Sequence, residues 1–371
     1  MTRNSNINPD SSYYGTGPEL LVTVLLPTYN RSDFLPLAIE SVLRQEYTNF
    51  ELIVIRDGGM PVEPIVQSCN DARIRFIDRS ENRGKAASLN EALAMARGDY
   101  IAYLDDDDIW YPNHLRVLAE TLRQSPEIGA VYSDLYKVHY RLLSGSRRQV
   151  LAKNVEISRD YDRLLMLQFN HVLHVSLMHR RELLDRCGLY NEQLNVLIDW
   201  DLTRRLCFYT DFLHVPVVTG EYYSAIENSD RISIQRRKNI NEYIRNVLTI
   251  RSHRPPKPWP QIEDLSVIIL HPKADDALMQ TLRILWGHSF YPHRVYLPLP
   301  VEEYEKVRLA FPNVVRVEPD EDDLYSSLDR MLGVCEGDYV AIVPTGLTVA
   351  SEESCFLTRS LHPLLTSSQG N

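Results

Sequence analysis

Short apolar runs that alternate with helical patterns constrain the fold of this chain more than any other feature. The runs from Leu20 to Leu26, Phe50 to Ile55 and Tyr100 to Leu104 are apolar except for Thr23 and Glu51, which is typical of strands buried in a parallel sheet. Between them lie helical segments, and the one from Ala86 to Ala96 is rich in strong helix formers. The alternation predicts an α/β fold with an open, largely parallel sheet flanked by helices.

Polar residues follow three of these strands directly. The sequence Pro27-Thr28-Tyr29-Asn30 ends the first strand, Asp57 follows the second, and four aspartates, Asp105 to Asp108, follow Leu104. Ligands of such sheets bind beyond the carboxyl ends of the strands, so we expect these residues to meet in one crevice. Crowded carboxylates repel one another unless a cation lies among them, and a divalent cation that also holds a diphosphate fits this need. A solvated acidic turn is the alternative.

Composition excludes some classes of protein. The net charge of -10 argues against a nucleic-acid partner, because phosphate backbones require a basic surface. The five cysteines are scattered without CxxC spacing, which fits a reducing compartment and no structural zinc. The N-terminal segment has no apolar signal core, and no run approaches the ~20 apolar residues that span a bilayer. We therefore expect a cytoplasmic protein, and peripheral attachment to the inner face of the membrane stays open.

The chain is long enough for two domains. Residues 1–19 are polar and predict a disordered lead, and residues 20–250 form the first α/β domain. A segment with four prolines between Arg251 and Pro260 predicts a linker over residues 251–262, and residues 263–371 form a second unit.

The second unit repeats about half of the first domain. Leu265 to Leu270 repeats the first strand, and Glu336 to Ala341 repeats Arg97 to Ala102. The alignment places Leu299 opposite Asp57 and Pro344-Thr345-Gly346-Leu347 opposite the four aspartates. We therefore expect a smaller, degenerate and truncated α/β unit without catalytic carboxylates, which does not bind a metal nucleotide. Homo-oligomerisation through this unit is left open.

Residues 20 to about 225 resemble a family 2 glycosyltransferase of the GT-A fold. The resemblance rests on motifs that occur in the family's order: Val24 to Asn30, Leu52 to Gly58, Asn82-Arg83-Gly84 with Asn90, Gly98 to Asp108, Gly188 to Glu192, and Asp199 to Leu202. It implies an inverting transfer of sugar from a UDP- or dTDP-sugar donor to the hydroxyl of a glycan or lipid-linked acceptor, in polysaccharide or cell-envelope biosynthesis. It also implies a divalent cation, Mn²⁺ or Mg²⁺.

The resemblance also implies roles for single residues on the donor side. Pro27, Thr28, Tyr29 and Asn30 line the nucleotide pocket, and Asp57 accepts a hydrogen bond from the imide N–H of uracil or thymine. Asp107 ligates the metal, while Asp105 or Asp106 reaches the ribose or an outer-shell water. Arg83 and Lys85 meet phosphate or ribose. The alternatives are an ordinary turn for Tyr29 and for Asp57, and solvated surface cations for Arg83 and Lys85.

On the acceptor side, Asp199 aligns with the family's catalytic aspartate, the general base that deprotonates the acceptor hydroxyl. Ile198 departs from the family, which usually has a glutamate before this aspartate, and a helix cap is the alternative role for Asp199. Trp200 stacks on an acceptor sugar or, alternatively, belongs to the core. Relatives often carry a histidine after the last strand of this domain, but none is present here, so either fewer protein ligands hold the metal or Arg231 approaches the diphosphate.

Two other functions compete with this interpretation. A nucleotidyltransferase usually has a Gly-rich, basic signature after the first strand, and Pro27 to Asn30 lacks it. A nucleotide-sugar-binding or scaffolding protein without transfer activity is the second alternative. The presence of Asp57, Asp107 and Asp199 together argues against it for the first domain.

Overall fold

The computed structural model describes residues 19–143, 147–155, 158–226, 240–288, 292–320 and 323–346. The predicted disordered lead up to residue 18, Arg231, and the chain from Leu347 onward lie outside these residues. By their contacts the residues form two compact units: the first comprises Met1–Tyr161, Val172–Asn195 and Thr210–Arg231, and the second comprises Asp162–His171, Val196–Tyr209 and Ile232–Asn371. The sequence instead placed a boundary after residue 250, and that domain boundary stays a prediction.

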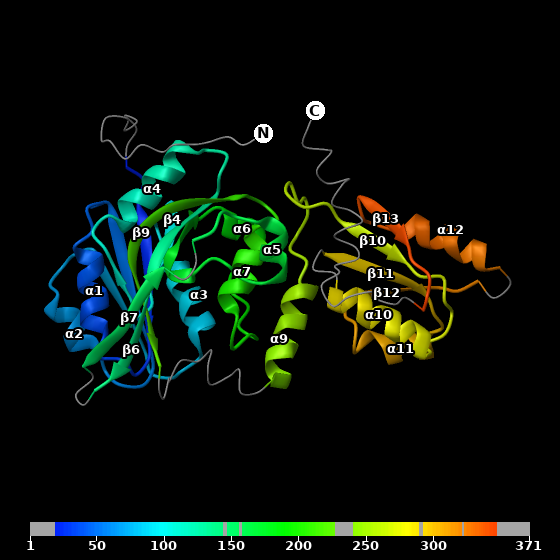
Figure 1. Cartoon of the computed structure of the whole chain (residues 1–371), viewed down its shortest axis with the longest axis horizontal. Coiled ribbons are helices and arrows are strands. Elements are labelled where there is room, and N and C mark those ends of the chain that lie inside the picture. Colours follow the sequence, from blue (N-terminus) through cyan, green and yellow to red (C-terminus); the bar gives the residue numbers. More distant parts are fainter. Residues whose placement is uncertain are drawn as a thin grey trace. The chain divides into compact units, whose positions relative to one another are not determined.

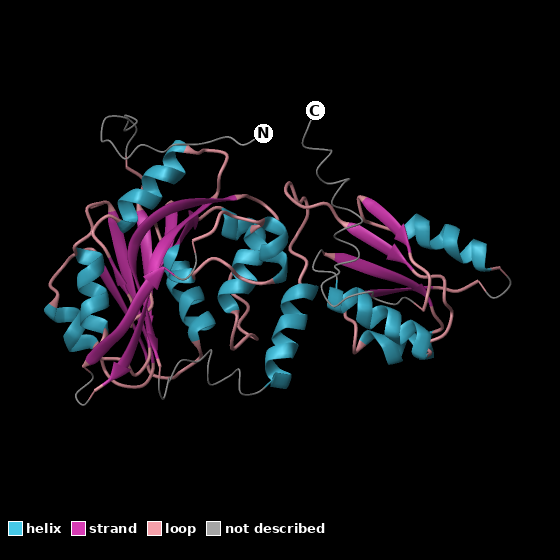
Figure 2. Ribbon diagram, viewed as in Figure 1, coloured by secondary structure: helices cyan, strands magenta, loops and turns pink. Residues whose placement is uncertain are grey.

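The first unit is built on a mixed, largely parallel sheet (Figures 1 and 2). The order in the sheet is β3-β2-β1-β4-β8-β6-β9-β5, with β7 paired to β6. The strands are β1 (Val22–Thr28), β2 (Phe50–Asp57), β3 (Ile74–Arg79), β4 (Tyr100–Tyr103), β5 (Ile109–Trp110), β6 (Ala130–Leu142), β7 (Arg148–Val155), β8 (Leu177–Arg180) and β9 (Phe212–Ala225). The helices are α1 (Leu35–Leu43), α2 (Glu63–Ser68), α3 (Lys85–Met95), α4 (His114–Gln124) and α6 (Leu183–Cys187), with a 3-10 turn at His174–Ser176.

The predicted parallel strands form the half of this sheet that carries the candidate site. Strand β1 pairs in parallel with both β2 and β4, which aligns their carboxyl ends along one edge. Alternate residues of β1, among them Val22 and Leu26, pack with α1 and α4 in the main apolar core, and α3 covers the opposite face (Figure 1). Burial on both faces explains why these strands are predominantly apolar.

The second unit contains a four-stranded parallel sheet whose order, β12-β11-β10-β13, matches β3-β2-β1-β4 of the first. Its strands are β10 (Leu265–Ile268), β11 (His293–Pro298), β12 (Val314–Val317) and β13 (Tyr339–Ile342). Its helices are α5 (Arg163–Gln168), α7 (Ile198–Leu206), α9 (Ile240–Ser252), α10 (Asp276–His288), α11 (Val301–Arg308) and α12 (Leu324–Val334). Helices α10, α11 and α12 alternate with the strands of this sheet along the chain, just as α1, α2 and α3 alternate with β1 to β4 in the first unit.

The repeat extends to single contacts. The backbone N–H of Gly98 donates to Thr23 Oγ1 at 2.9 Å, and the N–H of Gly337 donates to Ser266 Oγ at 3.0 Å. Thr23 pairs with Glu51 on β2, and Ser266 pairs with Arg294 on β11.

The charges next to these glycines are exchanged between the copies. Arg97 binds Glu51 in the first unit, whereas Glu336 binds Arg294 in the second. The same geometry is therefore stabilised by an ion pair of opposite polarity.

The register corrects one detail of the predicted alignment. Because Glu51 corresponds to Arg294, the position of Asp57 is taken by Pro300 and not by Leu299. The position of Asp105 is taken by Pro344, as predicted, since the N–H of Val343 binds Ile268 just as that of Leu104 binds Leu25. In the described part of the second unit, neither strand end carries the carboxylate of the first.

The Pro-rich segment predicted as a linker makes specific contacts in the second unit. Lys257 forms an ion pair with Asp264 at 2.8 Å, and Arg204 of α7 donates to the carbonyl of His253 at 2.9 Å. The phenol of Tyr209 donates to the carbonyl of Pro256. These contacts tie α7 to the start of the second sheet.

Among the helices in the described ranges, none combines the length and apolar character that a bilayer span requires.

Candidate active site

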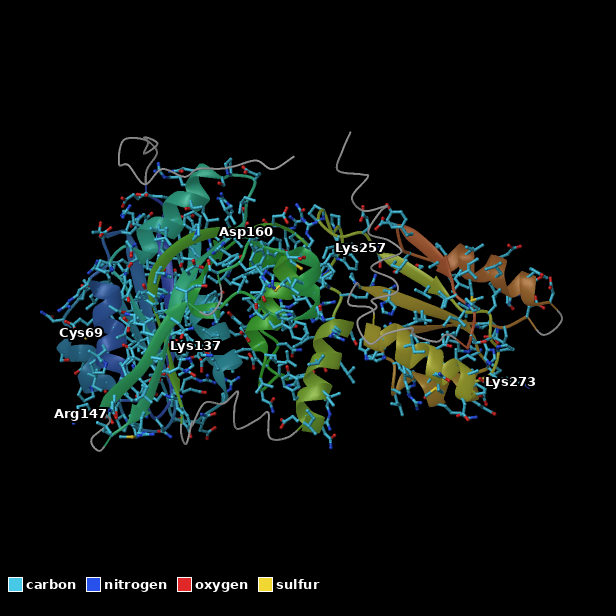
Figure 3. The ribbon with its side chains drawn as sticks, in the orientation of Figure 1. Cys69, Lys137, Arg147, Asp160, Lys257 and Lys273 are labelled. Carbon is cyan, nitrogen blue, oxygen red and sulfur yellow. The ribbon has the colours of Figure 1, made fainter. Side chains whose placement is uncertain are left out.

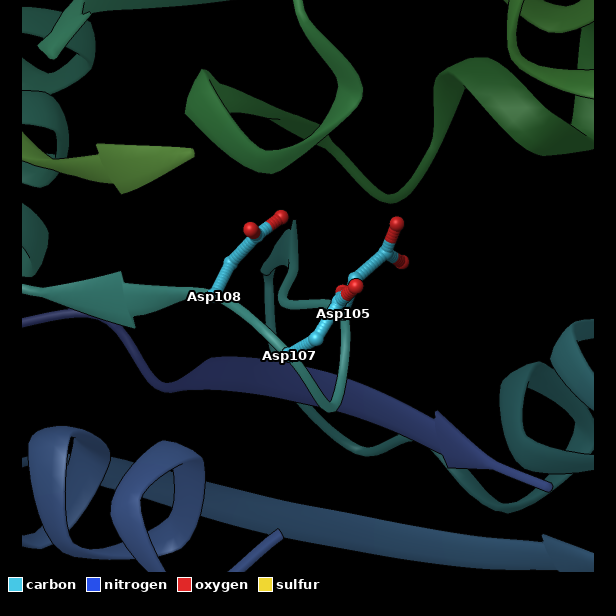
Figure 4. A group of neighbouring side chains, drawn as sticks. All are labelled: Asp105, Asp107 and Asp108. Carbon is cyan, nitrogen blue, oxygen red and sulfur yellow. The ribbon is translucent and has the colours of Figure 1, made fainter. Parts of the chain in front are cut away.

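The aspartate run forms a compact group of carboxylates at the end of β4. Ligand oxygens of Asp105, Asp107 and Asp108 lie within 4.8 Å of one another. Figure 4 shows the three side chains rising from one turn of the chain to the same side. The turn is held by the N–H of Asp108, which donates to the carbonyl of Asp105 at 3.1 Å. Hard divalent cations prefer oxygen ligands, so the donor set fits Mg²⁺ or Mn²⁺.

Asp106 points away from this group, toward the end of β1. Its Oδ2 accepts from Thr28 Oγ1 at 2.7 Å and from the N–H of Tyr29 at 3.4 Å. It therefore connects the loop after β4 to the loop after β1. Its expected contact with ribose stays a prediction.

Two cations lie against the aspartates. Lys85 Nζ donates to Asp105 Oδ1 at 2.5 Å, and Arg31 forms an ion pair with Asp107 and a longer one, at 3.6 Å, with Asp106. Sequence reasoning missed Arg31, although it directly follows the Pro27 to Asn30 motif.

The same environment gives the neighbouring carboxyl groups of Asp105 and Asp106 different pKa values. Burial and the charge of Asp107 raise the pKa of Asp106 to about 7. Burial also acts to raise the pKa of Asp105, but the charges of Lys85 and Arg31 and the hydrogen bond from Lys85 outweigh it and hold this pKa below its usual value. Asp105 is therefore ionised at neutral pH and available as a ligand.

Asp57 lies buried at the end of β2, with 4% of its surface exposed. Its Oδ1 accepts from the N–H of Arg83 at 2.9 Å, and its Oδ2 accepts from the N–H of Gly84 at 2.8 Å. Arg79, which sequence reasoning also missed, lies 3.2 Å from Oδ1. Asp57 thus fixes the start of α3, and a carboxylate oxygen has two lone pairs, so Oδ2 retains acceptor capacity for a ligand.

The other predicted donor residues lie around these carboxylates at the strand ends. Tyr29 is 45% exposed, and Asn30 Oδ1 accepts from the N–H of Met60 at 2.8 Å. Pro27 is partly buried, and the side chain of Arg83 is 61% exposed. The sequence therefore brings the donor-side residues to one edge of the sheet, and their contacts with a nucleotide stay predictions.

Asp199 lies in the second unit, in the first turn of α7. Leu197 takes the N-cap position with a left-handed φ of 63°, so Asp199 does not cap the helix. Its Oδ2 accepts from Asn170 Nδ2 at 3.0 Å, and Asn170 is a contact that sequence reasoning missed. Left-handed backbone at a branched residue such as Leu197 costs free energy and often occurs at functional positions.

Trp200, the predicted acceptor residue, is only 3% exposed, and its indole N–H donates to the carbonyl of Met166 at 2.8 Å. A tryptophan with this burial has no free face for a sugar ring. The geometry favours the alternative of a core tryptophan.

Two buried histidines, His174 and His179, surround Tyr103 in the first unit. His174 stacks on the Tyr103 ring with a centroid distance of 4.1 Å, and His179 lies 2.7 Å from the Tyr103 hydroxyl. Burial lowers the pKa of His174 to about 3 and that of His179 to about 4, so both are neutral. They support the strand that leads into Asp105.

Comparison with known proteins gives the class of the domain. Residues 23–186 match the sequence model of the glycosyl transferase family 2. Against the crystal structure of S. aureus TarS 1-349 in complex with UDP-GlcNAc, the TM-score is 0.51 at 15% identity, covering 64% of this chain and 68% of that one. This likeness shows the fold alone, which is the α/β fold predicted from the sequence.

Curated relatives point to the same family. WcaA of Escherichia coli K12, named for colanic acid biosynthesis, is 38% identical over 119 residues, 31% of this chain and 43% of that protein. YwdF of Bacillus subtilis 168, named an uncharacterized glycosyltransferase, is 29% identical over 184 residues, 50% of this chain and 67% of that protein. The glucosyltransferase WfgD of Escherichia coli is 37% identical over 100 residues, 27% of this chain and 40% of that protein. The matches thus span about two fifths of WcaA and of WfgD.

The sheet and the carboxylates at its edge lie in the segment that matches a glycosyltransferase domain. Residues 23–186 of this chain are thus similar to glycosyltransferase family 2.

Proposed function

We propose that this protein is an inverting glycosyltransferase that moves a sugar from a UDP- or dTDP-sugar to a hydroxyl of a glycan or lipid-linked acceptor. The observation that carries the proposal is the group of Asp105, Asp107 and Asp108 at the end of β4, inside the segment that matches the family. Parallel strands β1 and β2 end at the same edge, which is the usual ligand position in such sheets.

The metal site is proposed on three carboxylates instead of Asp107 alone. Asp108, to which the sequence resemblance assigned no role, contributes an oxygen to the group, whereas Asp106 does not. Asp105, Asp107 and Asp108 would hold Mn²⁺ or Mg²⁺, which would offset the charge of the donor's diphosphate and of the departing nucleoside diphosphate.

The cations of the chain supply the remaining charge for the donor. Lys85 and Arg31 already lie at the aspartates, and we assign them to the phosphates. Asp57 is held by two backbone N–H groups, which orients its free lone pair for the imide N–H of uracil or thymine. An acceptor at this point discriminates against cytosine, whose ring nitrogen carries no hydrogen there.

Asp199 is the proposed general base. As the acceptor oxygen attacks the anomeric carbon, Asp199 takes its proton, and the bond from the anomeric carbon to the diphosphate breaks with inversion. The support is the sequence resemblance, the partial exposure of the side chain and its hydrogen bond to Asn170. Because Ile198 replaces the family's glutamate, Asn170 is the neighbour we assign to orient the carboxylate.

The donor and acceptor classes draw on the relatives. WfgD is named a UDP-Glc:alpha-D-GlcNAc-diphosphoundecaprenol beta-1,3-glucosyltransferase, which unites a UDP-sugar with a lipid-linked acceptor. We accordingly place this protein in cell-envelope polysaccharide biosynthesis, acting in the cytoplasm at the inner face of the membrane. For the second unit we propose no nucleotide site, because Pro300 and Pro344 replace the positions of Asp57 and Asp105. Its role as an oligomer interface stays a prediction.

Isothermal titration calorimetry tests the donor site. With Mn²⁺ present, we expect wild-type protein to bind UDP or dTDP more tightly than CDP. We expect the Asp107→Asn variant to lose at least tenfold in affinity, because it removes one charged ligand. Asp185→Asn, at an exposed aspartate of α6, is the matched control and should bind as the wild type does. If wild-type protein binds no nucleoside diphosphate with Mn²⁺, the proposed function is wrong.

A further inference from the structure

Arg148 is the first residue of β7 and contacts the aspartate loop. It pairs with Leu142 of β6. Its Nη2 donates a hydrogen bond to the backbone carbonyl of Asp107 at 2.8 Å. The contact joins two positions that are 41 residues apart in the chain.

Three aromatic rings from three different elements enclose the guanidinium of Arg148. Its central carbon lies 4.0 Å from the ring centroid of Phe34, 4.0 Å from that of Tyr223 and 4.9 Å from that of Tyr140. Its buried Nε finds no hydrogen-bond acceptor among the described residues. A partly desolvated cation is attracted to the faces of aromatic rings, and the planar guanidinium fits between them. The rings therefore fix the position of the donor at Asp107.

Tyr223 connects the same aromatic group to the next aspartate. Its backbone N–H donates to Asp108 Oδ1 at 2.7 Å, while its phenol donates to Glu221 Oε2 at 2.5 Å. Together with Arg148, it holds the loop at two successive residues, Asp107 and Asp108, both members of the carboxylate group.

We propose that Arg148 is a positioning residue for the metal site. It orients the Asp107 peptide so that the three carboxylates converge, and its positive charge reduces their mutual repulsion. A loop held in advance loses less entropy when the cation binds, so affinity is higher. The inference rests on the proposed function, because it assigns Arg148 to the metal site proposed there.

Three variants separate positioning from charge and from general damage. Arg148→Ala removes the donor, the charge and the ring contacts. Arg148→Lys keeps the charge but cannot lie flat between the rings. Arg147→Ala is the matched control, because Arg147 is the exposed neighbour of the same type (Figure 3). Calorimetry measures the binding of Mn²⁺ alone, and thermal unfolding measures the stability of the fold. The rate of UDP-sugar hydrolysis is measured as a function of Mn²⁺ concentration.

We expect Arg148→Ala to bind Mn²⁺ about 10- to 100-fold more weakly, as is common when an outer-shell partner of a metal ligand is removed. Arg148→Lys should remain several-fold weaker than wild type, and Arg147→Ala should equal it. Hydrolysis by Arg148→Ala should return to within about threefold of the wild-type rate at saturating Mn²⁺. A merely structural role would instead lower the rate at every Mn²⁺ concentration.

If Arg148→Ala fails to fold, Phe34→Leu removes one ring without touching the hydrogen bond, and we expect it to weaken Mn²⁺ binding about threefold. The inference is overturned if folded Arg148→Ala binds Mn²⁺ as tightly as wild type does. If Arg148→Ala is unfolded, the same result in folded Phe34→Leu overturns it. Either result would leave the proposed function intact. If wild-type protein itself binds nucleotide but no Mn²⁺, the inference fails together with the metal site, while the donor site stands. Absence of both kinds of binding in the wild type would refute the proposed function itself.

Discussion

A methyl group added at Gly98 tests whether both sheets depend on the same close approach of strands. At Gly98, a Cβ atom would lie 2.5 Å from the backbone nitrogen of Thr23 and 2.7 Å from its Oγ1. At Gly337, it would lie 2.6 Å from the nitrogen of Ser266 and 2.7 Å from its Oγ. Neither nitrogen can move without shifting its strand. At Gly333 of α12, by contrast, a Cβ atom meets nothing within 4 Å.

The structure sets the size of the effect. Overpacking of this kind costs about 1–3 kcal/mol. The shift also lengthens the hydrogen bond from Gly98 to Thr23, worth about 1 kcal/mol. We therefore expect Gly98→Ala and Gly337→Ala each to lower the unfolding free energy of their own sheet by about 2–4 kcal/mol. Gly333→Ala should be neutral or raise stability by up to about 1 kcal/mol, since alanine favours helix.

Hydrogen exchange followed by mass spectrometry measures each sheet separately, which a single melting curve does not. A loss of 2 kcal/mol corresponds to about 30-fold faster exchange, because each 1.4 kcal/mol is a factor of ten. Gly98→Ala should accelerate exchange in β1 and β4, and Gly337→Ala in β10 and β13. Wild-type exchange in both variants would refute the shared packing, and with it the structural repeat.

Two further predictions concern single side chains. Burial acts to raise the pKa of Glu51, but hydrogen bonds from Arg97 and Thr23 outweigh it and hold this pKa below its usual value of 4.5. Ionised Glu51 therefore stabilises the fold above pH 4.5, and this stabilisation is lost as the pH falls through the pKa of the folded state. The stability advantage of wild type over Glu51→Gln in urea unfolding should therefore shrink below about pH 4.5, and an advantage independent of pH would contradict the assignment. Asn170→Ala should lower kcat about tenfold with little change in the KM for donor, because it frees the Asp199 carboxylate; a change in KM alone would argue against an orienting role.

The sequence predicted those helices and strands that local sequence patterns determine. Strands β1, β2 and β4 follow from predominantly apolar runs, and their carboxyl ends fall where polar residues begin. The insertion of β8 between β4 and β6 was not predictable, because it pairs Tyr100 with Arg180, far along the chain and antiparallel. Irregular alternation after Ser133 carries no information about such pairing.

The candidate site, too, was predicted only in part from the sequence. The aspartate run identified the right loop, but its members look alike in sequence. Only the loop geometry turns Asp106 toward Thr28 and includes Asp108 in the carboxylate group. Arg31 and Arg148 were missed because an arginine in a sequence does not reveal which carboxylate or carbonyl it reaches.

The central claim is sugar transfer from a nucleotide donor, and release of nucleoside diphosphate from a panel of nucleotide-sugars tests it most directly. With Mn²⁺, the account predicts that wild-type protein turns over one or more UDP- or dTDP-sugars. It also predicts that Asp199→Asn binds the same donor normally but transfers sugar at least 100-fold more slowly, as expected when a general base is lost. No turnover of any donor by wild-type protein, or transfer by Asp199→Asn at the wild-type rate, would contradict it.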